Sequence, residues 1–121
     1  MKIAVDYDNT ITEYPDFFRV FCSLFSASHE VFIITNRDPD STAAVEAELN
    51  GLGITYHQLI ITADKATAIM EHGITVFFDD TDEYFLNLPP EVCVLKVREP
   101  GNFDFDLKRW IYGDKTGYRI A

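Results

Sequence analysis

Continuous apolar runs that end in a polar residue are the main pattern of this chain. Three of them end in a side chain capable of chemistry: KIAVDYD over residues 2–8, VFIITNR over residues 31–37, and ITVFFDD over residues 74–80. An uninterrupted run of Ile, Val and Phe is typical of a strand that is covered on both faces, as in a parallel sheet. Because the carboxyl ends of parallel strands meet at one edge, we expect Asp6, Thr35 and Asp79 to lie close together.

Helical periodicity alternates with these runs along the whole sequence. An apolar stripe expected to pack into the core, for example, recurs at spacings of three and four residues in Phe17, Phe18, Phe21, Leu24 and Phe25. The predicted strands are residues 2–6, 30–35, 58–61, 74–78 and 92–97, and the predicted helices are residues 16–26, 40–50, 63–72, 82–87 and 104–112. This alternation predicts an α/β fold with a five-stranded parallel sheet, right-handed crossovers and helices on both faces.

Length and composition limit the class of protein. At 121 residues, with 47% hydrophobic residues, the chain predicts one globular domain over residues 1–121. No apolar run approaches the roughly 20 residues that span a bilayer, and no signal peptide is visible, so we expect a cytoplasmic protein. The two cysteines, Cys22 and Cys93, are far apart among apolar residues, which predicts two buried, reduced thiols.

The charge of the chain is negative and unevenly distributed. The formal net charge is −10, with 16 acids and 4 bases in residues 1–95 but 4 acids and 6 bases in residues 96–121. This excess of acids disfavours, without excluding, a nucleic acid bound through its phosphates. The basic residues of the last segment either face an anionic substrate or form solvated surface: Lys96, Arg98, Lys108, Arg109, Lys115 and Arg119.

Asp6 and Asp8 stand at the end of the first predicted strand. We expect the chain to turn here, because Asn9 tolerates unusual backbone angles. One carboxylate could then act as nucleophile and metal ligand while the other exchanges a proton with the leaving group. The alternative is an ordinary surface turn rich in Asp and Asn.

Further candidates follow the second and third predicted strands. The Thr35 hydroxyl could donate a hydrogen bond to a phosphoryl oxygen, and Asn36 and Arg37 are candidate substrate contacts beside it. Lys65 falls in the first turn of a predicted helix, where the helix dipole disfavours a cation. That placement suggests a use in holding the nucleophile and the charge of a phosphate.

Asp79 and Asp80 are adjacent acids after an apolar strand. Two such carboxylates are costly to hold together without a cation, and Mg²⁺ bound by carboxylates, water and a substrate phosphate would compensate them. With Asp6 and Asp8 they form the predicted metal site.

Taken in chain order, the candidate residues resemble the four motifs of the haloacid dehalogenase-like (HAD) hydrolase superfamily: Asp6-x-Asp8-x-Thr10, Thr35, Lys65 and Asp79-Asp80. The resemblance spans residues 2–80. It implies a three-layer, Rossmann-like fold with sheet order 5-4-1-2-3, a Mg²⁺ cofactor and an aspartyl-phosphate intermediate. It also implies roles for the matching residues: Asp6 as nucleophile and metal ligand, Asp8 as general acid/base and metal ligand through its carbonyl, Thr35 and Lys65 as phosphate-binding groups, and Asp79 with Asp80 as metal ligands.

Asp8 in this pattern resembles the phosphatases of that superfamily, and Asn9 departs from the more usual Gly. Only residues 11–15 separate Thr10 from the first helix, so no cap domain is expected. The resemblance therefore implies a phosphatase, nucleotidase-like or polynucleotide-phosphatase-like, that acts on a small or an exposed macromolecular phosphate. The resemblance also implies an alternative for such capless proteins, in which a second subunit completes the pocket.

Two other functions remain as alternatives. A non-catalytic protein could use the same acidic edge to bind a metal or a partner. A response-regulator-like receiver has a similar length and similar residue types, but its acidic pair comes early and its Lys last, which is the reverse of the order found here.

Overall fold

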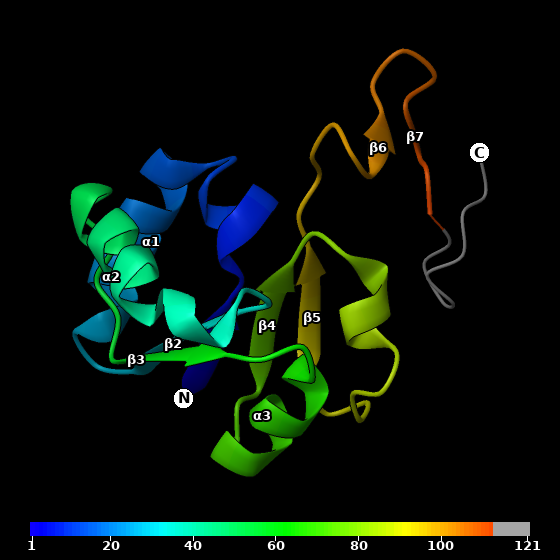
Figure 1. The fold of residues 1–121 in the computed structure, drawn as a ribbon. Coiled ribbons are helices and arrows are strands. Elements are labelled where there is room, and N and C mark those ends of the chain that lie inside the picture. The colour runs from blue at the N-terminus through cyan, green and yellow to red at the C-terminus, as the bar shows by residue number, and fades with distance from the viewer. Residues whose placement is uncertain (113–121) are drawn as a thin grey trace.

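The computed structural model describes residues 1–112, and a five-stranded parallel sheet forms its centre (Figure 1). Short helical turns, marked η, connect several of the strands. The elements in chain order are β1 (Lys2–Val5), η1 (Tyr7–Ile11), α1 (Pro15–Ser26), β2 (Glu30–Thr35), η2 (Pro39–Ser41), α2 (Thr42–Gly51), β3 (Gln58–Ile61), α3 (Lys65–His72), β4 (Val76–Asp79), η3 (Asp82–Phe85), β5 (Cys93–Lys96), β6 (Phe103–Asp104) and β7 (Arg109–Trp110).

The strand order is β3-β2-β1-β4-β5, and every neighbouring pair in this sheet is parallel. This is the predicted order read from the other edge, so the sheet predicted from the sequence is confirmed. Val5 of β1 is paired with Phe78 of β4, and the Asp6 amide donates to the Phe78 carbonyl at 2.9 Å. The residues that follow these two positions, Asp6 and Asp79, are therefore brought side by side by the register of the sheet.

The central strands β1 and β2 are buried on both faces, which explains why their interior positions are apolar, whereas β5 at the edge of the sheet is largely exposed. Ile3 and Val5 of β1 pack into one core with residues of α1 and α2. Ala4, between them, packs into a second core with Ala68 and Ile69 of α3. Side chains alternate between the faces of a strand, so neighbouring residues of β1 enter different cores.

The apolar stripe of α1 is only partly covered. Phe18 and Cys22, one turn apart, face the core, but Phe17 is 53% exposed and Leu24 is 73% exposed. The expectation that the whole stripe is core was therefore wrong. The stripe is wider than the contact that one helix makes with a sheet, and the margin that carries Phe17 and Leu24 turns toward solvent.

The predicted helix over residues 104–112 was also wrong, because this segment forms the antiparallel hairpin β6–β7. Asp104 Oδ1 accepts hydrogen bonds from the amides of Asp106 and Leu107, at 3.0 and 2.9 Å. This local side-chain bonding offers the backbone an alternative to helical hydrogen bonds. Lys108 then takes a left-handed conformation with φ of 55°, which closes the loop.

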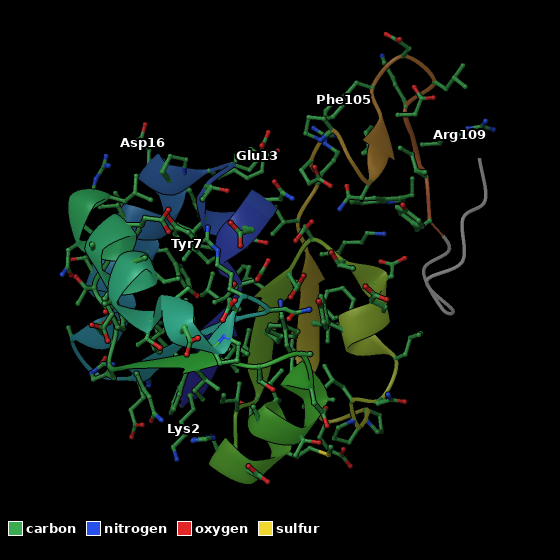
Figure 2. The ribbon with its side chains drawn as sticks, in the orientation of Figure 1. Lys2, Tyr7, Glu13, Asp16, Phe105 and Arg109 are labelled. Atoms are coloured by element: carbon green, nitrogen blue, oxygen red, sulfur yellow. The ribbon has the colours of Figure 1, made fainter. Side chains whose placement is uncertain are left out.

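The hairpin stands beyond the carboxyl end of β5, at the end of the molecule toward which β4 and β5 point (Figure 1). Phe105 on the hairpin and Lys2 at the start of β1 consequently lie at opposite ends of the molecule (Figure 2). None of the described helices is long and apolar enough to cross a membrane.

Both cysteines are free thiols, as predicted, but only one of them is buried. Cys22 has no exposed surface, and burial raises the pKa of its thiol to about 12. Cys93 is exposed, so its predicted burial was wrong. It opens β5, which is the outermost strand of the sheet on that side and is therefore less covered than the central strands.

Thiol chemistry should distinguish the two cysteines. We expect a water-soluble thiol reagent to modify one cysteine per native chain rapidly, because Cys93 is accessible and Cys22 is neither exposed nor ionised. Mass spectrometry after a short reaction gives the count, and Cys93→Ser should remove the fast reaction. Two modified thiols in denaturant serve as the control, and two fast thiols in the native protein would contradict this assignment.

Candidate functional site

Lys65 joins the ends of two neighbouring strands. Its Nζ donates to Asp6 Oδ1 at 2.9 Å and to Asp79 Oδ2 at 2.7 Å. Asp6 follows β1 directly, Asp79 is the last residue of β4, and Lys65 is the first residue of α3. The side chain of Asp64 caps this helix by accepting from the amide of Thr67. Each of the three residues stands where a strand ends or a helix begins at the same edge of the sheet. Their positions in the sequence therefore bring the three charged groups together.

The turn after β1 brings a hydroxyl back onto the carboxylates. Asn9 has a φ of 61°, and its amide donates to Thr12 Oγ1 at 2.8 Å. This conformation returns Thr10 toward the strand, where its Oγ1 donates to Asp6 Oδ2 at 3.1 Å and lies 3.4 Å from Asp80 Oδ1. The sequence marked Thr10 only as part of a motif, and its contact with both acids depends on the turn.

Three buried carboxylates form a cluster. One oxygen each of Asp6, Asp79 and Asp80 lie within 4.8 Å of one another, and the three residues are 4%, 0% and 6% exposed. If all are ionised, three negative charges face the single positive charge of Lys65, which leaves an excess of two. Carboxylate oxygens are ligands that hard divalent cations prefer, so this cluster could hold such a cation.

The pKa values of the three carboxyl groups are raised, which is consistent with this crowding of negative charge. Burial raises the pKa of Asp6 to about 7, against the attraction of Lys65 and with the help of Asp80. Burial likewise raises the pKa values of Asp79 and Asp80 to about 6, with further repulsion between the acids. Burial alone would lower the pKa of Lys65, but the charges of Asp79 and Asp6 outweigh it and the pKa is raised. Lys65 is therefore charged at neutral pH.

Tyr84 is part of the site, although no motif in the sequence pointed to it. Its ring lies 3.9 Å from the Nζ of Lys65, and its hydroxyl accepts a hydrogen bond from Asn36 Nδ2 at 2.9 Å. The aromatic face stabilises the ammonium from the side that the carboxylates leave open. Tyr84 belongs to η3, a short turn without helical periodicity, so its position depends on the fold.

A small pocket of about 120 Å³ opens beside Lys65 and combines candidate residues from the ends of β1, β2 and β4 with the start of α3. It is lined by Asp6, Asp8, Asn9, Thr35, Asn36, Lys65, Asp80, Thr81 and Tyr84. Thr35 is 1% exposed, and its Oγ1 has no hydrogen-bond partner among residues 1–112. An unpaired buried hydroxyl costs free energy, so this pocket presents a donor that a ligand could satisfy.

A larger cavity of about 330 Å³ lies on another side of Asp80, between η3 and the base of the hairpin. It shares Asp80 and Thr81 with the small pocket but contains neither Asp6 nor Lys65. We therefore place the chemistry in the small pocket. Asn102 lines the larger cavity, and its side-chain amide donates to the carbonyls of Asp80 and Val97. It thereby fastens the hairpin to the backbone of a cluster residue.

Asp8 and Arg37 lie together but outside the cluster. The Asp8 carboxylate is not one of the three that approach one another, and it forms a two-point ion pair with Arg37 at 2.7 and 2.9 Å. Arg37 also donates to Glu48 at 2.9 Å. Asn36, the other predicted substrate contact, is exposed and lines the pocket. Any metal contact of Asp8 through its carbonyl remains a prediction.

Two basic residues of the last segment, Lys96 and Arg98, contact other side chains of the protein, whereas Lys108 and Arg109 are exposed. Lys96 pairs with the buried Asp82 at 2.5 Å and lies over the ring of Trp110, and Arg98 lies over the ring of Phe103. Lys115 and Arg119 fall outside the described residues. These contacts give Lys96 a structural partner, and a substrate is not needed to explain it.

Comparison of the chain with protein-family models, with curated proteins and with solved structures found no match.

A divalent cation should stabilise the protein in a pH-dependent way. Unfolded carboxyls ionise near pH 3.8, whereas the folded groups do so near 6 and 7. Between these limits the folded state therefore binds more protons than the unfolded state. In EDTA, the free energy of unfolding should consequently fall as the pH rises from about 4 to 7. A cation binds the ionised carboxylates and should remove this penalty. At 100 times the Kd it adds about 2.7 kcal/mol.

Thermal unfolding at pH 5 and pH 8, with EDTA or with millimolar Mg²⁺, measures the effect. We expect the gain in Tm from Mg²⁺ to be clearly larger at pH 8. An equal gain at both pH values would show that the cation acts elsewhere than on these carboxylates.

Asp80→Asn should separate stability from cation binding. The amide keeps the shape of the side chain but removes one of the crowded charges, so we expect the Tm in EDTA at pH 8 to rise by roughly 3 to 8 °C. The stabilisation by Mg²⁺ should disappear in the same variant. Asp106→Asn, at an exposed acid of the hairpin, is the matched control and should change neither quantity. A lower Tm for Asp80→Asn would mean that the carboxylate is stabilising as it stands.

Proposed function

We propose that this protein is a magnesium-dependent phosphomonoesterase that works through an aspartyl-phosphate intermediate, as a capless, three-layer member of the HAD-like hydrolases. The observation that carries the proposal is the small pocket itself. It places the carboxylate of Asp6 beside a buried ammonium, Lys65, and an unpartnered hydroxyl, Thr35. A nucleophile, a cation and a hydrogen-bond donor around a space of phosphate size are the groups that phosphoryl transfer needs.

In the first step Asp6 attacks phosphorus and the bond to the leaving oxygen breaks. Asp8, on the rim of the same pocket, gives its proton to that oxygen. In the second step Asp8 removes a proton from water, whose oxygen attacks phosphorus and releases Asp6. The sum is one ester and one water converted to one alcohol and one phosphate, with both acids restored.

The other residues act on charge and orientation. Lys65 holds Asp6 in place through its hydrogen bond of 2.9 Å and offsets negative charge in the pocket. Thr35 orients a phosphoryl oxygen through its free hydroxyl. Mg²⁺, held by Asp6, Asp79 and Asp80, would neutralise their excess charge and polarise the phosphate when bound. Thr10 keeps Asp6 oriented from the opposite side.

The substrate is a phosphate monoester that can reach an open pocket. No domain is inserted between the elements of the described residues, so nothing in residues 1–112 encloses the leaving group. An exposed phosphate, of a nucleotide, a sugar or the end of a polynucleotide, fits this geometry, as does a small ester enclosed by a second subunit.

Asp6→Asn should abolish turnover while leaving the fold intact. The amide cannot form the phosphoryl-enzyme bond, and we expect kcat to fall by at least about 1,000-fold. Phosphate release is measured on p-nitrophenyl phosphate and on a panel of nucleotide and sugar phosphates, with Mg²⁺ and with EDTA. Asp106→Asn is the control and should retain wild-type activity.

Retained activity in Asp6→Asn would overturn the nucleophile, and activity unaffected by EDTA would overturn the metal. A wild-type protein that binds Mg²⁺ but releases no phosphate from any ester would favour the non-catalytic binding function. Stable phosphorylation by a small phosphodonor would favour the receiver.

A further inference from the structure

Every nitrogen of the Arg37 guanidinium is engaged within the protein. Nε and Nη2 donate to the two oxygens of Asp8 at 2.9 and 2.7 Å, and Nη1 donates to Glu48 Oε2 at 2.9 Å. The planar group also lies over the ring of Tyr7, 5.2 Å from its centre. The two acids and the ring fix the position of the guanidinium from three directions.

The pocket lining shows on which side of Asp8 this guanidinium lies. Asp8 and Asn9 line the small pocket, whereas Arg37 does not. Arg37 thus contacts the carboxylate of Asp8 from outside the pocket lining, and Asp8 and Glu48 take three of its five N–H groups. Its two-point contact with Asp8 is the geometry that an arginine makes best and a lysine cannot make.

We propose that Arg37 is a positioning residue for the proposed reaction: it acts through Asp8, holding this carboxylate in one orientation at the rim of the pocket, and does not itself bind the phosphate. The inference rests on the proposed function, and it replaces the expectation that Arg37 contacts substrate.

The pair has a consequence for the proton-transfer step. When Asp8 gives its proton to the leaving oxygen, the carboxylate that forms meets the guanidinium across two hydrogen bonds. The same two hydrogen bonds hold Asp8 in the orientation from which its proton can reach the leaving oxygen. Arg37 should matter most when the leaving oxygen needs a proton, and least when the oxygen departs as a stable anion.

Substrates with different leaving groups therefore test the proposal. p-Nitrophenyl phosphate releases a stabilised phenolate, whereas ethyl phosphate, or the best alkyl ester of the panel, must release a protonated alcohol. The value of kcat/KM reports all steps up to the departure of the leaving group. It is to be measured with saturating Mg²⁺ for wild type, Arg37→Ala, Arg37→Lys and Asp8→Asn.

Glu48 offers a variant that reaches Arg37 from outside the site. Glu48→Ala removes only the outer partner of the guanidinium, on the exposed side of α2. Glu46→Ala is its matched control, because Glu46 is an exposed acid of the same helix with the same change of charge and no ion pair to Arg37.

We expect Arg37→Ala to lower kcat/KM for the alkyl ester by about 100-fold, and for p-nitrophenyl phosphate by less than about 3-fold. Arg37→Lys should lie between Arg37→Ala and wild type. Glu48→Ala should show the same selectivity at about 3- to 10-fold, and Glu46→Ala no effect. Adding Arg37→Ala to Asp8→Asn should cost little more, because both changes remove one function. Affinity for inorganic phosphate, measured by calorimetry with Mg²⁺, should be unchanged in Arg37→Ala.

A different pattern would overturn the proposal without touching the proposed function. Equal losses for both esters, with KM raised and phosphate bound at least 10-fold more weakly, would show that Arg37 binds the phosphate. Unchanged kinetics in Arg37→Ala would make the ion pair merely structural. A wild-type protein inactive toward every ester would overturn the phosphatase itself and, with it, the role of Arg37.

Discussion

The close approach of three buried carboxylates to one ammonium is the constraint on which this structure depends. Asp6 and Asp79 cannot avoid each other, because β1 and β4 are neighbours in register and each residue stands at the end of its strand. The buried Lys65 offsets one of their charges and Asp80 adds a third. Burial and mutual repulsion raise the pKa values of these carboxyl groups, so the cluster costs stability when it is ionised, and a divalent cation could offset that cost.

The groups around the cluster are placed to hold it in this unfavourable state. Thr10 contacts two of the acids, Tyr84 covers the ammonium, and Asn102 binds the backbone carbonyl of Asp80. They come from three different turns and hairpins at the carboxyl edge of the sheet. Because each of these partners is neutral, none of them cancels the negative charge of the ionised carboxylates, which could therefore be compensated by a divalent ion.

The sheet and its acidic edge could be predicted because the signals for them are local. Runs such as Ile3–Val5 are apolar on both faces, and the residue after each run is fixed at the edge by strand geometry. The hairpin at residues 103–110 was missed because one side chain, Asp104, redirects the backbone against an apolar pattern compatible with a helix. Exposure of Cys93 was missed because it depends on β5 being an outer strand, which a single run does not show.

The parts of the site that could not be predicted depend on contacts between residues far apart in the sequence. Arg37 and Asp8 are 29 residues apart, and both have polar neighbours in the sequence. The sequence alone therefore could not show whether Arg37 contacts a substrate or Asp8. The structure separates these possibilities, because Asp8 lines the small pocket and Arg37 does not. In the proposed phosphatase, the rest of an ester would lie across the polar residues of the pocket lining, Asn9, Asn36 and Thr81. Asn9 and Asn36 are exposed, so discrimination between the proposed substrates would fall mainly to these two residues.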